Sequence, residues 1–575
     1  MPKRYILIIA LLITCGHDSM AQLTVDSRMT VRDSLTDTHL CSIPESHFGH
    51  DLTVSQVGFN GLENVAINGI NASSGFTFSA IDGTKTWTVT ATLPDGKKAS
   101  TKLQFTFLPI VEINSVVEKN VYNTGTVTVL LPDEDIVSPA RVKYRGSATN
   151  SHVYLKRNYH IKFQDEEGNK MDYKFFDGLR SDNSWLLDAG TLDHMRVRNR
   201  VLTDLWLDMA SKPYYSDIEP KALNASRGKM VEVFRNGEYQ GIYNMCEAMD
   251  RKQLKLAKTD EATGEIHGQL WKAGQRTSTT RMATAPQYDN FMETWSGFET
   301  QYPDFDDLCP TDYSTLHDAV NFVANSTDEE FAAHAHEYLD EPVLRDIAIL
   351  LQVIFAYDNM GKNTYWATRD RNDGPMITPV VWDLDTSLGQ SWHNNEYHPS
   401  YLKPDLDVFT YSSNTDVYLK RLIKWDVDSF STLSGQRYRD LRKGLLSTDS
   451  ILSRFASCID MLRHAGAAQR EEARWVRCSD LYGRSINFDA ELSFITQWLT
   501  QRMQWLDEHY YNECPAGDVD GNGLVDISDA NILISYLLYK KQLIPEIYTY
   551  RLDAKRDMSI DISDMNVVIN KILGK

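Results

Sequence analysis

The chain has 575 residues, enough for about three or four domains, and its 42% hydrophobic and 11% aromatic residues suit globular folding. Its 59 basic and 79 acidic residues give a formal net charge of −20 at pH 7. This balance argues against nucleic acid or an anionic membrane surface as the main partner, because both repel a negatively charged protein.

The N-terminal residues have the pattern of an export signal rather than of a folded element. Two basic residues precede an apolar run over 5–15 that is too short to span a bilayer as a helix. Small residues at 19–21 then predict a signal peptide over 1–21, with the mature chain beginning at Gln22. The alternative is lipoprotein processing at Cys15. Both routes predict a secreted or cell-surface protein, and no later apolar run predicts a transmembrane segment.

Six cysteines remain after the predicted signal peptide, and no two of them form a CxxC pair. A zinc site is therefore not expected. Disulfides in an exported protein and buried free thiols both remain open, with Cys458 and Cys478 the nearest pair in the sequence.

Residues 22–110 have the pattern of a β-rich domain. Residues 86–93 alternate polar and apolar side chains, a Pro-Asp-Gly turn follows at 94–96, and a second strand is predicted over 103–107. Short strands over this length predict an immunoglobulin-like β-sandwich. No catalytic cluster occurs there, which favours a spacer or adhesive role.

Residues 111–512 are predicted to form a larger unit, with strands first and helices later. Apolar residues recur at helical spacing over 328–339, 341–357 and 491–509. This order predicts an α+β fold with a nucleotide cleft between two lobes.

Three residues in this unit have the types and spacing that phosphoryl transfer needs. Asp358 and Asn363 are five positions apart, and Asp383 follows at the end of an apolar run. In phosphoryl transfer one Asp orients the hydroxyl nucleophile, while an Asn and a later Asp hold the metal that bridges the phosphates. Asp385 is two residues beyond Asp383, so a strand over 377–385 would place both carboxylates on one face as magnesium ligands.

The residues around this motif resemble the spore-coat CotH kinase-like family. The matching segments are 145–147, 156–163, Asp193 with Arg198 and Asn199, 237–247, 321–323 with 328–331, 358–363 and 382–385. The resemblance implies an atypical protein-kinase fold, ATP with magnesium or manganese, and phosphorylation of Ser or Thr on a secreted protein substrate.

The same resemblance implies roles for individual residues. Asp358 is the expected catalytic aspartate and Asp383 the expected metal aspartate, while Asn363 joins them through the chemistry described above. The candidates for contacts with the nucleotide or its phosphates are Arg145, Lys156, Lys162 and Glu247.

The tail, 513–575, contains an internal repeat of two twelve-residue acidic loops, each followed by an aliphatic helix. Oxygen donors at alternate positions with a turn glycine are the pattern of a calcium loop. The first loop offers Asp518, Asp520, Asn522, the backbone carbonyl of Leu524, Asp526 and Asp529, with Gly523 at the turn. The second offers Asp553, Asp557, Ser559, Asp561 and Asp564. There Lys555 and Met558 replace a donor and the glycine, so weaker calcium binding or none is expected.

This tail resembles a type I dockerin, which implies a small all-α module that docks onto a cohesin-type protein module. Residues at loop positions 10 and 11 help to choose the partner in that family. Ile527-Ser528 and Ile562-Ser563 occupy these positions, so either copy could face the cohesin.

Two other functions compete with an exported kinase. The first is a non-catalytic structural or adhesive part of a surface complex that degrades polysaccharides, since ATP is scarce outside the cell. The second is direct glycan hydrolysis by Asp358 and Asp383 as a carboxylate pair. Asn363 has no purpose in hydrolysis, which makes this the weakest of the three.

Overall fold

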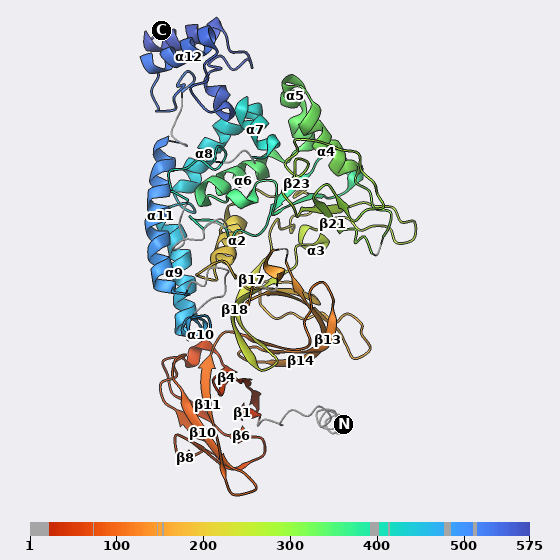
Figure 1. The fold of residues 1–575 in the computed structure, drawn as a ribbon, viewed down its shortest axis with the longest axis vertical. Helices are drawn as coiled ribbons and strands as arrows, with labels where there is room; N and C mark the ends of the chain where they lie inside the picture. The colour runs from red at the N-terminus through yellow and green to blue at the C-terminus, as the bar shows by residue number, and fades with distance from the viewer. Residues whose placement is uncertain are drawn as a thin grey trace.

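The computed structural model describes residues 22–72, 74–146, 148–151, 154–306, 308–390, 402–411, 415–476, 485–509 and 515–575. The predicted signal peptide, Ser147, Cys478 and Cys514 lie outside these ranges. Within them, no helix combines the length and the apolar character needed to cross a membrane. The described chain is elongated, with N-terminal strands at one end, a barrel next to them, then helices around a second sheet, and the C-terminal helices at the other end (Figure 1).

The N-terminal region is rich in short strands, as predicted. Its sheets have the orders β2-β1-β6, β3-β4-β11-β10-β7-β8 and β5-β9, and β11 runs parallel to β4. Three buried rings, Phe78, Trp87 and Phe105, pack edge to face in their shared core. The strands are β1 (Leu23–Val25), β2 (Arg28–Met29), β3 (Val31–Asp33), β4 (Thr38–Ser42), β5 (Leu52–Val54), β6 (Val57–Phe59), β7 (Glu63–Ile67), β8 (Ile70–Asn71), β9 (Phe76–Phe78), β10 (Trp87–Thr92) and β11 (Lys98–Thr106). The immunoglobulin-like arrangement stays a prediction.

The next seven strands close into a barrel with the order β12-β13-β14-β15-β16-β18-β17. The sequence predicted strands here but not their closure. Alternation along each strand gives the barrel two different faces. On β14, for example, Ala140, Val142 and Tyr144 point into the apolar interior, while Arg141 and Lys143 face outward. The strands are β12 (Ile110–Asn114), β13 (Asn123–Leu130), β14 (Asp135–Arg145), β15 (Asn158–Phe163), β16 (Ser184–Asp188), β17 (Gly228–Arg235) and β18 (Glu238–Glu247).

Beyond the barrel, a second sheet with the order β20-β21-β19-β22-β23 is surrounded by helices. Its strands are β19 (Gln269–Ala273), β20 (Thr294–Trp295), β21 (Phe298–Tyr302), β22 (Thr364–Thr368) and β23 (Thr378–Val381). The helices are α2 (Arg198–Met209), α3 (Arg251–Leu254), α4 (Ser314–Asn325), α5 (Asp328–Tyr338), α6 (Glu341–Ile354), α7 (Val417–Lys424), α8 (Phe430–Arg442), α9 (Thr448–His464), α10 (Ala467–Arg474) and α11 (Phe488–His509).

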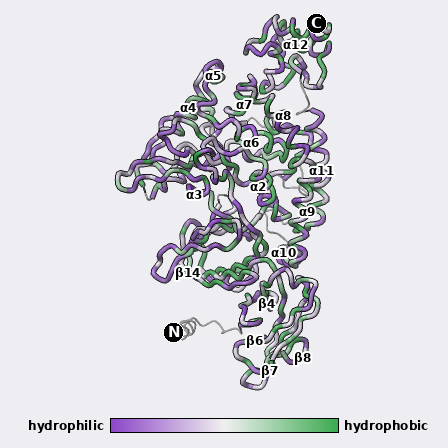
Figure 2. The backbone as a smooth tube through the Cα atoms, turned by 180° about the vertical axis from the view of Figure 1, so that it is seen from behind, coloured by the Kyte–Doolittle hydropathy of each residue, from purple (hydrophilic) through white to green (hydrophobic). Residues whose placement is uncertain are grey.

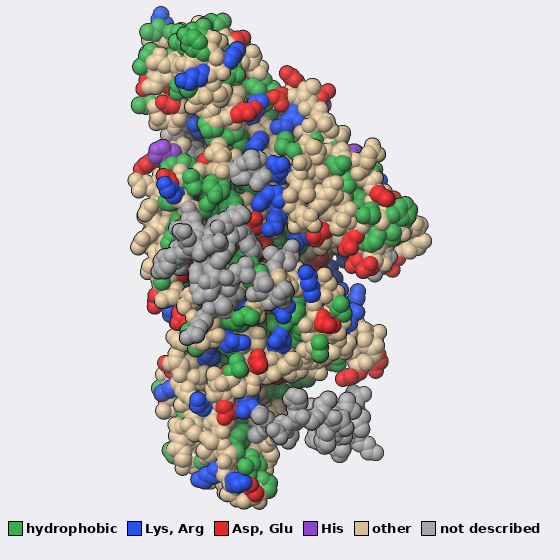
Figure 3. Space-filling model, viewed as in Figure 1, with side chains coloured by type: hydrophobic (Ala, Val, Ile, Leu, Met, Phe, Trp, Pro, Cys, Tyr) green, Lys and Arg blue, Asp and Glu red, His purple; other side chains and the backbone are tan. Residues whose placement is uncertain are grey.

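Hydrophobic and charged residues gather on different parts of this fold. Hydrophobic residues concentrate along the strands of the N-terminal sheets and the barrel (Figure 2). On the face drawn in Figure 3, Lys and Arg side chains gather where the barrel meets the sheet and helices, and Asp and Glu side chains gather on the projecting part that holds β21.

A buried ionic network joins the barrel to the C-terminal helices. Glu471, on α10, accepts hydrogen bonds of 2.7 Å from Lys156 Nζ, Arg196 Nε and the backbone N–H of Ile242. The side chains of Lys156, Arg196 and Glu471 are fully buried. Removing one member of such a network leaves buried charge without compensation.

The C-terminal module consists of α12 (Ile527–Tyr539), a 3₁₀ segment η6 (Glu546–Arg551) and α13 (Ile562–Ile572). It is joined to the rest of the chain through η6. Ile547 and Tyr548 belong to the large hydrophobic core shared with the helices, and the Tyr548 hydroxyl donates to Asp407. Glu546 lies 3.7 Å from Lys424 on α7.

Replacement of Glu471 by glutamine should destabilise the protein strongly. Glu471→Gln leaves Lys156 and Arg196 buried without a carboxylate, and we expect a loss of about 3–5 kcal/mol in the free energy of unfolding. Denaturant unfolding followed by tryptophan fluorescence measures this loss, with Glu261→Gln at an exposed loop position as the control. Equal stability of both variants would contradict the role given to this network.

Candidate functional site

A pocket lies where the outer face of the barrel meets the end of the second sheet. Barrel strands β14, β15, β16 and β18 contribute one wall, and the segments that flank β19, β22 and β23 contribute the other. Its polar lining includes Arg145, Asn158, Asp188, Asn199, Asn244, Lys272, Lys362, Asn363, Asp383 and Asp385. Four of the residues predicted for this chemistry, Arg145, Asn363, Asp383 and Asp385, are therefore brought together.

Asp358 lies beside this pocket on a short 3₁₀ turn, η3 (Tyr357–Asn359). Helix α6 was expected to continue to Tyr357, but it ends at Ile354 because Phe355 adopts a left-handed conformation with φ 52°. The buried Asp358 carboxylate accepts hydrogen bonds of 3.1 Å from Arg276, Lys362 and Asn363 Nδ2. Three donors from different positions therefore fix the direction in which this carboxylate points.

The segment that carries Asp383 does not have the conformation expected from the sequence. A strand over 377–385 was predicted, but β23 ends at Val381 and Asp383 has φ 61°. Asn363 has φ 57°, and positive φ is uncommon for residues other than glycine and often occurs at functional sites. The strand prediction was wrong at this end, yet both Asp383 and Asp385 line the pocket.

Two amide side chains hold these segments in place. Asn359 Nδ2 donates to the carbonyl of Trp382 at 2.8 Å, which joins the Asp358 turn to the Asp383 segment. Asn199 Nδ2 donates to Asp188 at 2.7 Å, and its Oδ1 accepts from the N–H of Leu384 at 3.0 Å. Asp188 on the barrel is thereby fixed relative to Asp383 and Asp385.

The carboxylates of this pocket are crowded, and the nearby cations Lys272 and Lys362 offset their charge only in part. Burial, followed by the charge of Asp188, raises the pKa of Asp383. Burial and the neighbouring carboxylates of Asp383 and Asp188 raise the pKa of Asp385 further. Among the described residues, no Lys or Arg forms an ion pair with these three carboxylates. A cluster of hard oxygen ligands whose negative charge is only partly offset fits a magnesium or manganese ion.

Positive charge lines the other side of the pocket. Arg145 lies over the ring of Trp382, with its guanidinium carbon 5.4 Å from the ring centre. Lys272 is on β19 opposite Glu299, and burial lowers the pKa of its ammonium group. The sequence pattern did not single out Lys272, Asp188 or Lys362. The available signal for Lys272 was a charged residue within the otherwise apolar run 270–273.

The other predicted nucleotide contacts lie apart from the pocket lining. Lys156 is buried against Glu471, and burial lowers its pKa to about 7. Glu247 is buried and forms an ion pair with Arg227 at 2.7 Å. Lys162 is on the outer face of β15, near the ring of Tyr122. Of the four residues predicted from the resemblance, only Arg145 lines the pocket.

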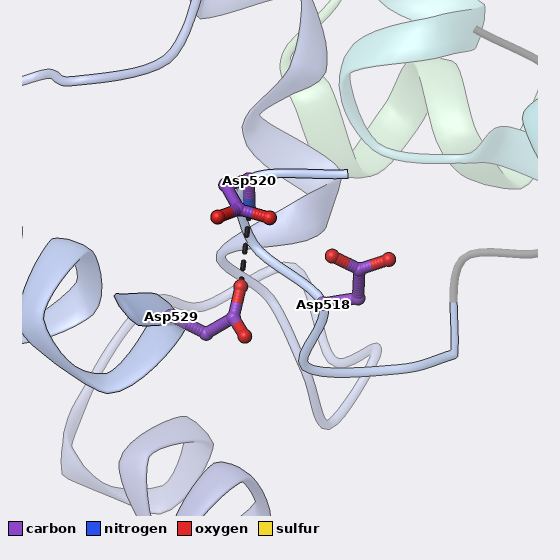
Figure 4. Close-up of side chains that lie close together, drawn as sticks. All are labelled: Asp518, Asp520 and Asp529. Atoms are coloured by element: carbon purple, nitrogen blue, oxygen red, sulfur yellow. Dashed lines mark hydrogen bonds between the residues drawn. The ribbon is translucent and has the colours of Figure 1, made fainter. Parts of the chain in front are cut away.

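The first tail loop folds around its acidic residues. Ligand oxygens of Asp518, Asp520 and Asp529 lie within 4.8 Å of one another (Figure 4). Asp518 accepts from the N–H groups of Gly521, Asn522 and Gly523, and Asp529 accepts from those of Val519, Asp520 and Asp526. Gly521 and Gly523 have φ 78° and 90°, so this tight turn uses the conformational freedom of glycine.

The second loop has the same backbone conformation as the first but lacks one of its oxygen ligands and its glycines. Arg556 and Met558 have φ 63° and 62°, the conformations that glycines adopt in the first loop. L-residues are strained there. Lys555 Nζ forms an ion pair with Asp557 at 2.9 Å, so a cation is paired with a predicted calcium ligand. Among the described residues, only the first loop brings three such ligand groups within 4.8 Å.

Asp416 connects the tail to the Asp358 loop. This buried residue is the N-cap of α7, whose Lys424 faces η6 of the tail. A Cβ atom placed on Gly361 would lie 3.4 Å from Asp416 Oδ1 and 2.3 Å from Arg281 Cγ. The turn at Gly361 thus packs directly against the start of α7.

Protonation of Asp416 should make stability depend on pH. Burial raises its pKa from 3.8 to about 7, so the folded protein binds more protons than the unfolded chain between these values. Its contribution to stability is therefore present at low pH and is lost as pH rises from about 4 to 7. Asp416→Asn should remove this part of the slope in thermal unfolding. An identical dependence in wild type and variant would show that Asp416 does not titrate in this range.

Calcium should bind mainly to the first tail loop. Titration of the full-length protein by calorimetry should show one strong site and one weak or absent site. Asp518→Ala should abolish the strong site, and the matched change Asp553→Ala in the second loop should leave it intact. Equal loss of calcium binding in both variants would contradict the difference between the loops.

Two known family models match the chain, one over the region that holds the pocket and one over the tail that holds the calcium loops. The model for CotH kinase protein matches residues 142–506, more than half of the chain. The model for the dockerin type I domain matches residues 516–573, which implies calcium binding and a cohesin partner. No curated protein matches the chain. The chain therefore belongs to the CotH kinase protein family and carries a C-terminal type I dockerin domain.

Proposed function

We propose that this protein is an exported protein kinase that transfers phosphate from ATP to Ser or Thr residues of an extracellular or surface protein. The observation that carries the proposal is the arrangement of Asp358 and Asn363 beside Asp383 and Asp385 at one pocket. Family membership supports the same chemistry. In this proposal the dockerin tethers the kinase to a cohesin-bearing complex.

The pocket residues fit the two charged parts of a metal–nucleotide complex. Asn363, Asp383 and Asp385 are suited to hold magnesium or manganese, with Asp188 as a further carboxylate from the barrel. Arg145, Lys272 and Lys362 place positive charge near the phosphates. When bound, the metal neutralises charge that develops on the transferred phosphoryl group.

Asp358 is assigned to the acceptor. Its carboxylate accepts hydrogen bonds from three side chains and lies beside the pocket lining, so it can orient a Ser or Thr hydroxyl and take its proton. Because Arg276 and Lys362 lie within 3.1 Å, the charge of the carboxylate is already balanced before the acceptor arrives. Preorganised donors of this kind reduce the rearrangement needed during reaction.

In this proposal the tail holds the protein in place in an assembly and takes no part in the reaction. Ile527 and Ile562, at equivalent positions of the two repeats, are 65% and 69% exposed, so the repeated Ile-Ser pairs are accessible to a cohesin. Together with the predicted signal peptide, this supports a secreted or cell-surface protein held in a larger assembly.

The catalytic assignment predicts different effects for its two aspartates. Purified protein incubated with labelled ATP, magnesium and a protein acceptor should transfer label. Asp358→Asn should lower transfer by at least about a hundredfold yet retain metal-dependent nucleotide binding, since it acts on the acceptor. Asp383→Asn should lose both.

Asp373→Asn, in the exposed turn between β22 and β23, is the control for the same chemical change. Equal labelling by wild type and Asp358→Asn would rule out the catalytic role of Asp358. Absence of ATP binding in the wild type would favour the alternative function, a structural component of a polysaccharide-degrading complex.

A further inference from the structure

Four cations lie on one face of the barrel without counterions. Arg141, Lys143 and Arg145 alternate along β14, and Lys162 lies beside them on β15, opposite Arg141 in the strand register. Among the described residues, none of the four has a carboxylate within 4 Å. In a protein with a net charge of −20, a cluster of cations without partners is unusual.

Tyr122 organises three of these cations. Lys143 Nζ, Lys162 Nζ and the guanidinium carbon of Arg141 lie 4.4, 5.0 and 5.6 Å from its ring centre. The ring is fixed because the Tyr122 hydroxyl contacts His160 Nδ1 at 2.9 Å, while His160 Nε2 contacts Ser184 at 2.8 Å. A rigid aromatic platform that gathers cations at cation–π distance keeps them together despite their repulsion.

This cationic strip (Arg141, Lys143, Arg145 and Lys162) continues outward from the pocket. Arg145 belongs to the pocket lining, whereas Arg141, Lys143 and Lys162 do not. Burial and neighbouring cations lower the pKa of both Lys143 and Lys162, so charged lysines there are destabilised until an anion binds. A nucleotide in the pocket would use Arg145 and leave the other three without a partner.

Two acidic residues from another part of the chain lie near the strip. Asp304 and Glu293 partly oppose the lowering of the pKa of Lys143 by burial, and Asp304 does the same for Lys162, but neither approaches within ion-pair distance. These two carboxylates lie near the strip without pairing with its cations. The strip therefore remains open to an anion from another molecule.

We propose that the cationic strip binds an acidic segment of the protein acceptor while the acceptor hydroxyl is presented to Asp358. The inference rests on the proposed kinase function and names its substrate class. Along a strand, Arg141 and Arg145 are about 13 Å apart, the length of about four residues of extended chain. An extended acidic segment of about four residues would therefore span the strip from Arg141 to Arg145.

The test compares two synthetic peptides that differ only in charge. One has Asp and Glu residues on both sides of a single Ser, and the other has Asn and Gln at the same positions. Fluorescence anisotropy with the full-length protein should show tighter binding of the acidic peptide by about tenfold at low salt, with a loss of this preference as salt rises. If transfer occurs, the acidic peptide should also show the higher kcat/KM.

The double variant Lys143→Glu/Lys162→Glu should lose the preference for the acidic peptide and keep nucleotide binding, because neither lysine lines the pocket. Lys97→Glu makes the same change at a side chain 80% exposed on the N-terminal domain and should behave like the wild type. Unchanged preference in the double variant, or equal binding of both peptides by the wild type, would overturn the proposal. Weakened nucleotide binding in the double variant would instead assign the strip to the nucleotide.

The anisotropy measurement separates this inference from the proposed function. Charge-selective peptide binding without transfer of label would support the strip and count against the kinase. Transfer of label to both peptides at equal rates would support the kinase and reject the strip.

Discussion

The pocket depends on carboxylates that the protein crowds together and that its nearby lysines neutralise only in part. Asp188, Asp383 and Asp385 come from the barrel and from the segment after β23, and no described Lys or Arg forms an ion pair with them. Such crowding opposes folding unless the segments are held by other contacts. Asn199 and Asn359 supply these contacts through hydrogen bonds to Asp188, Leu384 and Trp382. In the proposed function, the repulsion that remains favours binding of a divalent cation.

The two faces of the barrel wall have different roles: the inner face forms an apolar core, and the outer face carries charged side chains. Inward side chains of β14 and β15 form an apolar core, and the alternate outward residues supply Arg145 to the pocket and the remaining cations of the strip. Because period-two alternation links both faces, a shift of one residue in register would bury the cations. The core therefore fixes where the charges stand relative to Asp358.

The dockerin is joined to the kinase-like part by more than a linker. Tyr548 on η6 donates to Asp407, which also accepts from Gln352 on α6, the helix that leads into the Asp358 turn. Helix α7, whose Lys424 lies near η6, has Asp416 as its N-cap beside Gly361. The segment between the two calcium loops is thus part of the core that supports the Asp358 loop.

The sequence by itself identified the family and the dockerin, and it singled out Asp358, Asn363, Asp383 and Asp385 as candidates, because spacing within one segment reports chemistry that is local. It also predicted the difference between the calcium loops, since Lys555 and Met558 break a pattern whose ligands lie in one loop. Only the tertiary structure showed that Asp188 and Lys272 line the pocket and that Lys156 and Glu247 do not. These positions depend on strand pairing between residues far apart in the sequence. The closed barrel and the positive φ of Asp383 were likewise decided by long-range contacts, which alternation within a strand does not encode.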